Sequence, residues 1–272
     1  MSLYLWPGSA KAAVSITLDN LGESRDVGVG SWPEDKPTGQ HPSVLQVLPK
    51  ILEILENNDV KATYFMEAWG MATYPETVKS FQRDGHEIGF HAYQHEEWKH
   101  LSPKEEEEIL KKSFKIAHDL GVKYKGFRPP GGSMNAGTKD LLRQYGFKYA
   151  SILSSSISVD DDFVTLPFQW RAVDAFYILK EFDFLRAEYG EREEVLPVEV
   201  FQQGLFDQID EVVKNGGYLD ILFHPFLHTS EEYRAVIEAV LNRVKSNPDI
   251  WCAQTKDVAQ WVSDHIGHFK RT

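Results

Sequence analysis

Residues 85–98 read GHEIGFHAYQHEEW, a short apolar strand followed at once by two histidines in a polar, aromatic setting. His91 and His95 are four residues apart, which places two side chains on one face of a helical turn, and a loop leaving a strand brings them together equally well. Imidazole is the commonest protein ligand for zinc and related ions. Surface histidines share this spacing, so the pair alone is only weak evidence for a metal site.

The pattern of strand, loop and helix recurs on both sides of this stretch. Strands are expected at residues 12–18, 62–65, 87–90, 126–128, 148–152, 218–223 and 251–254, and helices lie between most of them. Ser102 and Glu105 form a capping box that predicts a helix up to Leu120. Residues 154–196 follow no clear pattern. The alternation of strands and helices in the rest of the chain predicts an α/β fold with a parallel sheet closed into a barrel, forming a single domain over residues 1–272.

Composition narrows the function classes. The chain has 42% hydrophobic and 26% charged residues, as in globular proteins, and a formal net charge of -12. This acidic balance argues against nucleic acid or anionic lipid as a partner, and no apolar run reaches membrane-spanning length. The single cysteine, Cys252, excludes an internal disulfide, and no signal peptide is recognisable in residues 1–8. We therefore expect a cytoplasmic protein without a membrane partner.

Polar residues that directly follow the predicted strands are candidates for an active site. In parallel α/β folds the site lies at the carboxyl ends of the strands, where side chains from different strands meet. These positions hold an acid, three imidazoles and a guanidinium: Asp19, His91, His95, Arg128 and His224. This set of types on one face predicts hydrolytic chemistry. Nearby, Trp170, Asp174 and Tyr177 are candidates for a pocket wall, whereas His228 is expected to be structural.

Three ordered motifs resemble the polysaccharide deacetylase family, carbohydrate esterase family 4. Residues 17–20 (TLDN) match its paired-aspartate signature, residues 91–95 (HAYQH) its histidine pair, and residues 127–132 (FRPPGG) its arginine-proline loop. Residues 221–224 (ILFH) are a weaker match. The resemblance is best over residues 14–152, and it implies a distorted (β/α)7-type barrel that hydrolyses an acetamido or related C–N bond.

The resemblance also implies a role for each matched residue. Asp19 would be the general base, Arg128 would orient it and His224 would be the general acid, while His91 and His95 would hold a divalent metal, with zinc favoured. Such an ion acidifies bound water and polarises an amide carbonyl, and an imidazolium can protonate the departing amine. The turn at Pro130 and Gly131 would contact the substrate and help to hold the oxyanion.

The sequence departs from the family pattern at Asn20. The family's metal-binding aspartate falls on this residue or, with a different spacing, on Leu21, so that an anionic ligand is missing. Three arrangements follow. Asn20 ligates the metal weakly; or Asp19 becomes the ligand, with Glu23 or water-mediated chemistry supplying the base; or the site works without metal. We predict a retained metal held by His91, His95 and Asn20, with Asp19 close to it.

The predicted function is hydrolysis of a non-peptide C–N bond in a saccharide or small-molecule substrate. One alternative is a metal-independent hydrolase of a cyclic imide or ureide, because the missing secretion signal and the long segments at residues 32–41 and 177–189 resemble those of intracellular-type relatives. Another alternative, motivated by Asn20, is an inactive domain that binds a carbohydrate or a small molecule. Analogy with the same relatives suggests a homo-oligomer.

Overall fold

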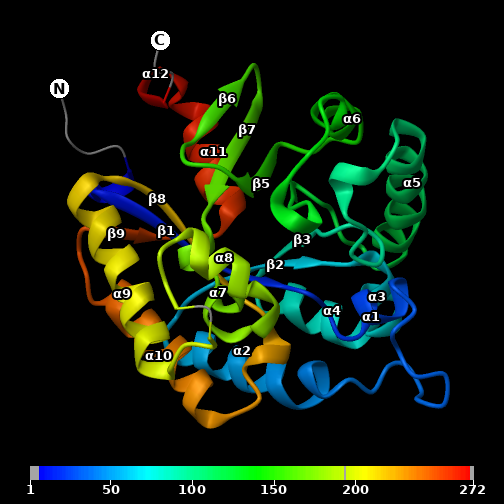
Figure 1. Ribbon diagram of the computed structural model, residues 1–272. Helices are drawn as coiled ribbons and strands as arrows, with labels where there is room; N and C mark the ends of the chain where they lie inside the picture. The colour runs from blue at the N-terminus through cyan, green and yellow to red at the C-terminus, as the bar shows by residue number, and fades with distance from the viewer. Residues whose placement is uncertain (1–5, 193, 270–272) are drawn as a thin grey trace.

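The computed structural model describes residues 6–192 and 194–269 (Figure 1). Residues 1–5, which contributed to the expected cytoplasmic location, and both ends of the predicted domain lie outside this range. Across the described residues, no helix has the length and apolar character needed to cross a bilayer. The strands are β1 (Ala12–Asp19), β2 (Thr63–Met66), β3 (Glu87–Phe90), β4 (Gly126–Phe127), β5 (Tyr149–Leu153), β6 (Ser158–Asp160), β7 (Phe163–Phe168), β8 (Gly217–Phe223) and β9 (Ile250–Cys252).

The helices lie mainly on the outside of this sheet, and Figure 1 shows α9 and α10 beside β8 and β9. The α-helices are α1 (Ser24–Gly28), α2 (Leu48–Asn57), α3 (Ala68–Thr73), α4 (Pro75–Arg83), α5 (Pro103–Asp119), α6 (Thr138–Gln144), α7 (Asp174–Ile178), α8 (Asp183–Glu188), α9 (Val198–Asn215), α10 (Glu231–Lys245), α11 (Thr255–Asp264) and α12 (Ile266–Phe269). A π-helical turn, η2 (Ser43–Val47), leads into α2. Short 3-10 turns are η1 (Pro7–Ser9), η3 (Trp98–His100), η4 (Pro130–Gly132), η5 (Trp170–Ala172), η6 (Lys180–Phe182) and η7 (Pro225–Leu227).

Seven parallel strands form the barrel in the order β7-β5-β4-β3-β2-β1-β8. The ring is incomplete between its two end strands, where a single parallel bridge joins Val173, beyond the end of β7, to Leu222 in β8. One bridge in place of a full ladder explains why the barrel is distorted. The predicted (β/α)7-type barrel is confirmed, because parallel strands joined by helices close in this way.

The origin of the seventh strand differs from the sequence prediction. The predicted strand at residues 251–254 is β9, which pairs only with the start of β1, at Ala12–Val14. At this end of β1, β9 pairs with the same edge that β2 pairs with from Thr17 onward. The other edge of β1 is paired with β8. The missing barrel strand is β7, which lies in the part of the chain that showed no clear pattern. All six residues of β7 are buried, so alternation could not reveal it.

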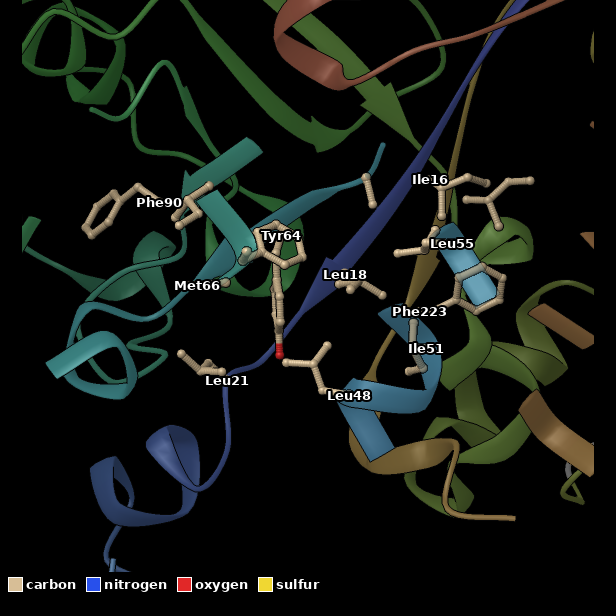
Figure 2. Close-up of a cluster of buried hydrophobic side chains, with 14 of the residues drawn as sticks. Ile16, Leu18, Leu21, Leu48, Ile51, Leu55, Tyr64, Met66, Phe90 and Phe223 are labelled. Atoms are coloured by element: carbon tan, nitrogen blue, oxygen red, sulfur yellow. The ribbon is translucent and has the colours of Figure 1, made fainter. Parts of the chain in front are cut away.

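The side chains of β1 alternate between the barrel interior and the helical layer, as a strand requires. Ile16 and Leu18 pack outward into the buried cluster of Figure 2, against Leu48, Ile51 and Leu55 of α2. The intervening residues are polar and point the other way, so that the interior of the barrel carries hydrogen-bonding groups that lead up to Asp19. This alternation sets the register in which Asp19 faces the site and not the core.

Local signals explain several of the helices. Ser102 caps α5, and its hydroxyl accepts a hydrogen bond from the Glu105 amide while the Glu105 carboxylate accepts one from the Ser102 amide. The predicted capping box is therefore confirmed. Pro49 lies in the first turn of α2, where the helix follows the π-helical turn η2 and a residue without an amide hydrogen is tolerated. The short helices α1, α3, α7 and α8 were not predicted.

Candidate active site

The carboxyl ends of five barrel strands bring the candidate side chains together. Asp19 ends β1, His91 follows β3, Arg128 follows β4 and His224 follows β8, as the sequence predicted. Glu67 follows β2 in the same way, although the sequence analysis did not select it. Four of these side chains are largely buried, and that of His224 remains 12% exposed. The site is therefore a polar pocket at one end of a parallel barrel.

Arg128 organises the floor of the site. Its Nη1 donates to Asp19 Oδ1 at 2.8 Å, and its Nη2 donates to Asp220 Oδ2 at 2.5 Å. Thr17 and Ser151 accept further hydrogen bonds from the guanidinium. Burial raises the pKa of Asp19, and the charge of Arg128 opposes that rise. Arg128 thus fixes the orientation of Asp19 and keeps a carboxylate available where water is excluded.

The ring of His91 is held in one tautomer. Its Nδ1 lies 2.7 Å from the carbonyl oxygen of Arg128, which can only accept a hydrogen bond, so Nδ1 carries the proton. The lone pair of Nε2 is then free to face the site, where it lies 3.8 Å from Asp19 Oδ2. Burial lowers the pKa of His91 to about 3 and also lowers that of His95. Both imidazoles are therefore neutral and have a lone pair to offer.

Glu67 completes a group of three ligand-type side chains with these histidines. One ligand atom from each of Glu67, His91 and His95 lies within 4.8 Å of the other two. Glu67 Oε1 accepts a hydrogen bond from Asn20 Nδ2 at 2.9 Å, and Oε2 accepts one from the amide of Leu21 at 2.7 Å. Burial raises the pKa of Glu67 to about 8, which favours the neutral acid at neutral pH when no cation is bound. The two hydrogen bonds orient its side chain and leave lone pairs on its oxygens that can bind more.

This geometry adds Glu67 to the candidate ligands. Asn20 was predicted to ligate a metal, and its amide nitrogen donates to Glu67, the residue directly after the neighbouring strand β2, so its side-chain oxygen is the atom that could serve as a ligand. Leu21, the other candidate position, contributes only its backbone amide to Glu67. Glu23, the alternative base, accepts hydrogen bonds from the Gly39 amide and from the Tyr74 hydroxyl, so both of its oxygens already have partners.

The backbone around these residues is held in an unusual conformation. Asn20, Ala92 and His95 are non-glycine residues with φ between 65° and 69°. Each such residue costs of order 1 kcal/mol and persists only where the surroundings impose it. Helix α1 packs against the histidine loop, where a Cβ added to Gly28 would lie 2.6 Å from the Gln94 carbonyl oxygen. Strained backbone concentrated in two neighbouring loops is typical of a functional site.

His224 is close enough to Asp19 for their charges to interact, and it is held by Asp174 of α7. The Asp174 carboxylate accepts hydrogen bonds from the backbone amide and from Nδ1 of His224, both at 2.6 Å. Burial opposes the charged form of His224, but the Asp174 carboxylate outweighs it and raises the pKa overall; Asp19 acts in the same direction. His224 is therefore suited to carry a proton next to the site, with Nε2 as the only ring nitrogen left to deliver it.

The predicted substrate contacts occupy the rim. Pro130 is buried in η4, Gly131 is exposed with a φ of 76°, and Trp170 is half-buried in η5. The Trp170 ring packs edge-on against Phe168 and Phe182. These contacts place Trp170 on the carboxyl side of β7, although they also give it a packing role.

Sequence analysis missed one residue of the site, Glu67, and the role of another, Asp174. Glu67 carried a usable signal, because it is a polar residue directly after a predicted strand, the rule that selected Asp19 and His91. Asp174 was noted only as a wall candidate, because it lies in the stretch without a clear pattern. Its partnership with His224 joins residues 50 positions apart and could not be inferred without the barrel closure.

Comparison with known families matches residues 34–150 to the polysaccharide deacetylase family model. This range contains Glu67, His91, His95 and Arg128, whereas Asp19 and His224 lie outside it. A peptidoglycan deacetylase of Helicobacter pylori is 29% identical over 140 residues, which are 51% of this chain and 47% of that protein. The chain thus spans less than half the length of this curated relative.

Solved structures agree over nearly the whole chain. A protein of Mycobacterium smegmatis described as a polysaccharide deacetylase superposes with a TM-score of 0.83 and 25% identity, covering 96% of this chain and 93% of that one. A structure described as PuuE allantoinase superposes with a TM-score of 0.76 and 19% identity, covering 98% and 94%. At 19% identity, the likeness to the allantoinase structure shows a shared fold.

Proposed function

We propose that this chain is a member of the polysaccharide deacetylase family and a metal-assisted hydrolase that removes an acyl group from an acetamido substrate. The observation that carries the proposal is that two proton-handling groups lie in the same site, close enough for their charges to interact. Asp19 is held by Arg128, and His224 is held by Asp174. Hydrolysis of an amide needs both, since water must lose a proton and the leaving amine must gain one.

Asp19 is the proposed general base. Its Oδ1 is occupied by Arg128, and its Oδ2 faces His91 Nε2 at 3.8 Å, so that Oδ2 is the atom directed at the site. The raised pKa brings the carboxylate closer to the operating range of a base. His224 is the proposed general acid, because Asp174 holds Nδ1 and favours the protonated ring, which leaves the Nε2 proton for the leaving amine.

Glu67, His91 and His95 are the residues that would hold a divalent metal. Two neutral imidazoles and one carboxylate are a donor set found in catalytic zinc sites, and the fixed Nδ1 proton of His91 matches the outer hydrogen bond that metal-ligating histidines make. When bound, such an ion acidifies water and polarises the substrate carbonyl. Asn20 is proposed to orient Glu67. Pro130, Gly131 and Trp170 remain the proposed substrate contacts.

We propose a saccharide or a related small amide as the substrate, in line with the family and with the peptidoglycan deacetylase of Helicobacter pylori. The second candidate is a cyclic ureide or imide, favoured by the overall likeness to the allantoinase structure. A homo-oligomer and a cytoplasmic location remain predictions from the sequence.

The test measures acetate released from N-acetylglucosamine oligomers and from peptidoglycan, next to ring opening of allantoin, by purified protein supplied with Zn²⁺. Acetate release that disappears in D19N supports the deacetylase proposal. Arg83→Ala, at an exposed position at the C-terminal end of α4, is the matched control and should keep full activity. Ring opening without acetate release would move the assignment to a ureide hydrolase, and loss of both in the folded wild-type protein would leave the binding-domain hypothesis.

A further inference from the structure

A pocket of about 420 Å³ lies between α2 and α4. Figure 1 shows these two helices side by side on the outside of the barrel. The wall that α2 contributes is largely apolar, because Leu48, Pro49 and Leu52 line it. Pockets of this volume and character commonly bind small molecules, and the few polar groups in their lining decide which molecule fits.

His86 is part of this lining and is only 8% exposed. It directly precedes β3, whereas His91 of the active site directly follows the same strand. One face of the His86 ring stacks on Phe81 at a centroid distance of 4.4 Å. The pocket and the active site therefore lie at opposite ends of β3, and His86 is held rigidly at its own end.

The hydrogen bond to Ala62 fixes the tautomer of His86. Nδ1 accepts from the backbone amide of Ala62 at 3.0 Å. A backbone amide can only donate, so Nδ1 carries no proton, and the proton of the ring is on Nε2. Among residues 6–192 and 194–269, no group accepts a hydrogen bond from this Nε2. His86 thus presents a donor, on a side chain more than nine-tenths buried, that needs an acceptor from the pocket.

Lys61 supplies a positive charge beside this donor. It lines the same pocket, and a Cβ added to Gly85, the neighbour of His86, would lie 3.8 Å from its Cε. No carboxylate of the described residues forms an ion pair with the Lys61 ammonium. Hydrogen bonds between cationic donors and carboxylates are stronger than neutral ones. A carboxylate is therefore the acceptor that suits His86 and Lys61 together.

Acidic side chains line the rest of the pocket. Glu53 and Glu56 come from α2, and neither forms an ion pair with a described residue. Asp84, at the end of α4, faces Arg83 at 3.5 Å. Three carboxylates and one ammonium give this lining a negative balance, which disfavours a ligand that is only an anion. A ligand with both charges matches the lining, since its ammonium can pair with the acids.

We propose that this pocket binds a free α-amino acid with an apolar side chain. The carboxylate of the amino acid accepts from His86 Nε2 and pairs with Lys61. Its ammonium pairs with Glu53 and Glu56, and its side chain packs against Leu52. One water, with a share of about 30 Å³, would satisfy Nε2 but leave the apolar wall hydrated, which is unfavourable. The inference is independent of the proposed function, because it uses no residue of the active site.

The test titrates the wild-type protein with L-leucine and follows the Nε2 signal of His86 by nitrogen-15 NMR of histidine-labelled protein. This signal should shift and saturate. Two probes with the same carbon frame each lack one charge, since 4-methylpentanoate has no ammonium and 3-methylbutylamine has no carboxylate. Each should bind at least about 10-fold more weakly than leucine. No saturable shift at millimolar leucine, or equally tight binding of either probe, would overturn the inference.

Two variants test the polar contacts, with affinities measured by isothermal titration calorimetry. K61Q removes the exposed cation, and H86N keeps an acceptor for the Ala62 amide but removes the Nε2 donor, so each should weaken leucine binding roughly 10-fold. K61Q and the wild-type titration decide the matter if H86N does not fold.

The matched control is K111Q, at an exposed lysine of α5 outside the pocket, and it should bind leucine like the wild type. D19N should also bind leucine normally while acetate release is lost, which separates this site from the proposed function. Unchanged affinity in K61Q, or loss of leucine binding in D19N, would contradict a site at this pocket.

Discussion

The side-chain amide of Asn20 donates a hydrogen bond to Glu67 Oε1 at 2.9 Å. The residue that takes the place of an expected acidic ligand thereby orients a carboxylate supplied by the next strand. Besides Asp19 at the end of β1, the site therefore has an acidic side chain directly after β2, and the Leu21 amide donates to its other oxygen, which ties the two loops together.

Removing the charge of Glu67 should abolish tight metal binding. In E67Q the two histidines remain, but the anionic ligand is lost, so that the affinity for Zn²⁺ should fall by at least about 100-fold, and acetate release should fall with it. Competition of the purified protein with a fluorescent zinc chelator measures the affinity directly.

The matched comparison for Glu67 is N20A. This substitution removes one hydrogen bond to Glu67 but leaves the Leu21 amide in place, so the affinity should fall by no more than about 10-fold to 100-fold, as for other residues that orient a ligand. A larger loss in N20A than in E67Q would show that Asn20, and not Glu67, binds the metal.

Neutralising Asp174 should shift the pH dependence of catalysis toward acid. Asp174 raises the pKa of His224, so the protonated acid is lost at lower pH in D174N, and the alkaline limb of kcat should shift toward acid. At neutral pH, kcat should fall by about 100-fold or more, the scale of a general acid contribution. A pH–rate profile of the variant provides the measurement, and an unshifted alkaline limb would separate Asp174 from the proton transfer.

Replacing Arg128 should destabilise the fold as well as the site. R128M leaves the buried Asp19 and Asp220 without their shared cation, which should lower the free energy of unfolding by about 3 to 5 kcal/mol. Urea denaturation at pH 7 measures the loss. The control D140N breaks an ion pair with Arg143 whose aspartate is 77% exposed, and it should cost less than about 1 kcal/mol. Equal stability of the two variants would contradict the structural role of Arg128.

The close approach of β4 to β5 should make Gly126 sensitive to any side chain. A Cβ at this position would lie 1.9 Å from Cζ of Tyr149, a ring whose hydroxyl also donates to Glu87. G126A should therefore lower the free energy of unfolding by about 1 to 3 kcal/mol or more. Gly137 has no atom within 4 Å of the same point, and G137A should change stability by less than about 1 kcal/mol. Thermal unfolding followed by circular dichroism compares the two.

Local sequence determined the elements whose signals lie within a few residues. The capping box fixed the start of α5, and apolar runs located β1, β2, β3 and β8, because each pattern repeats at the period of its own element. The rule that active sites form at the carboxyl ends of parallel strands then brought Asp19, His91, Arg128 and His224 to one rim before any contact was known. The same rule, applied to β2, would have included Glu67.

The tertiary structure decided what depends on distant contacts. Strand β7 is buried on both faces and has no alternation, so only its pairing with β5 and the Val173–Leu222 bridge identify it as the seventh strand. Closure of the barrel at that point brings the Asp174 carboxylate into contact with the rings of His224 and His228. No sequence spacing predicts either contact. The His91 and His95 pair came from the sequence alone. Its carboxylate partner came from the fold, because which side chain reaches a pair of histidines depends on the strand that lies beside them.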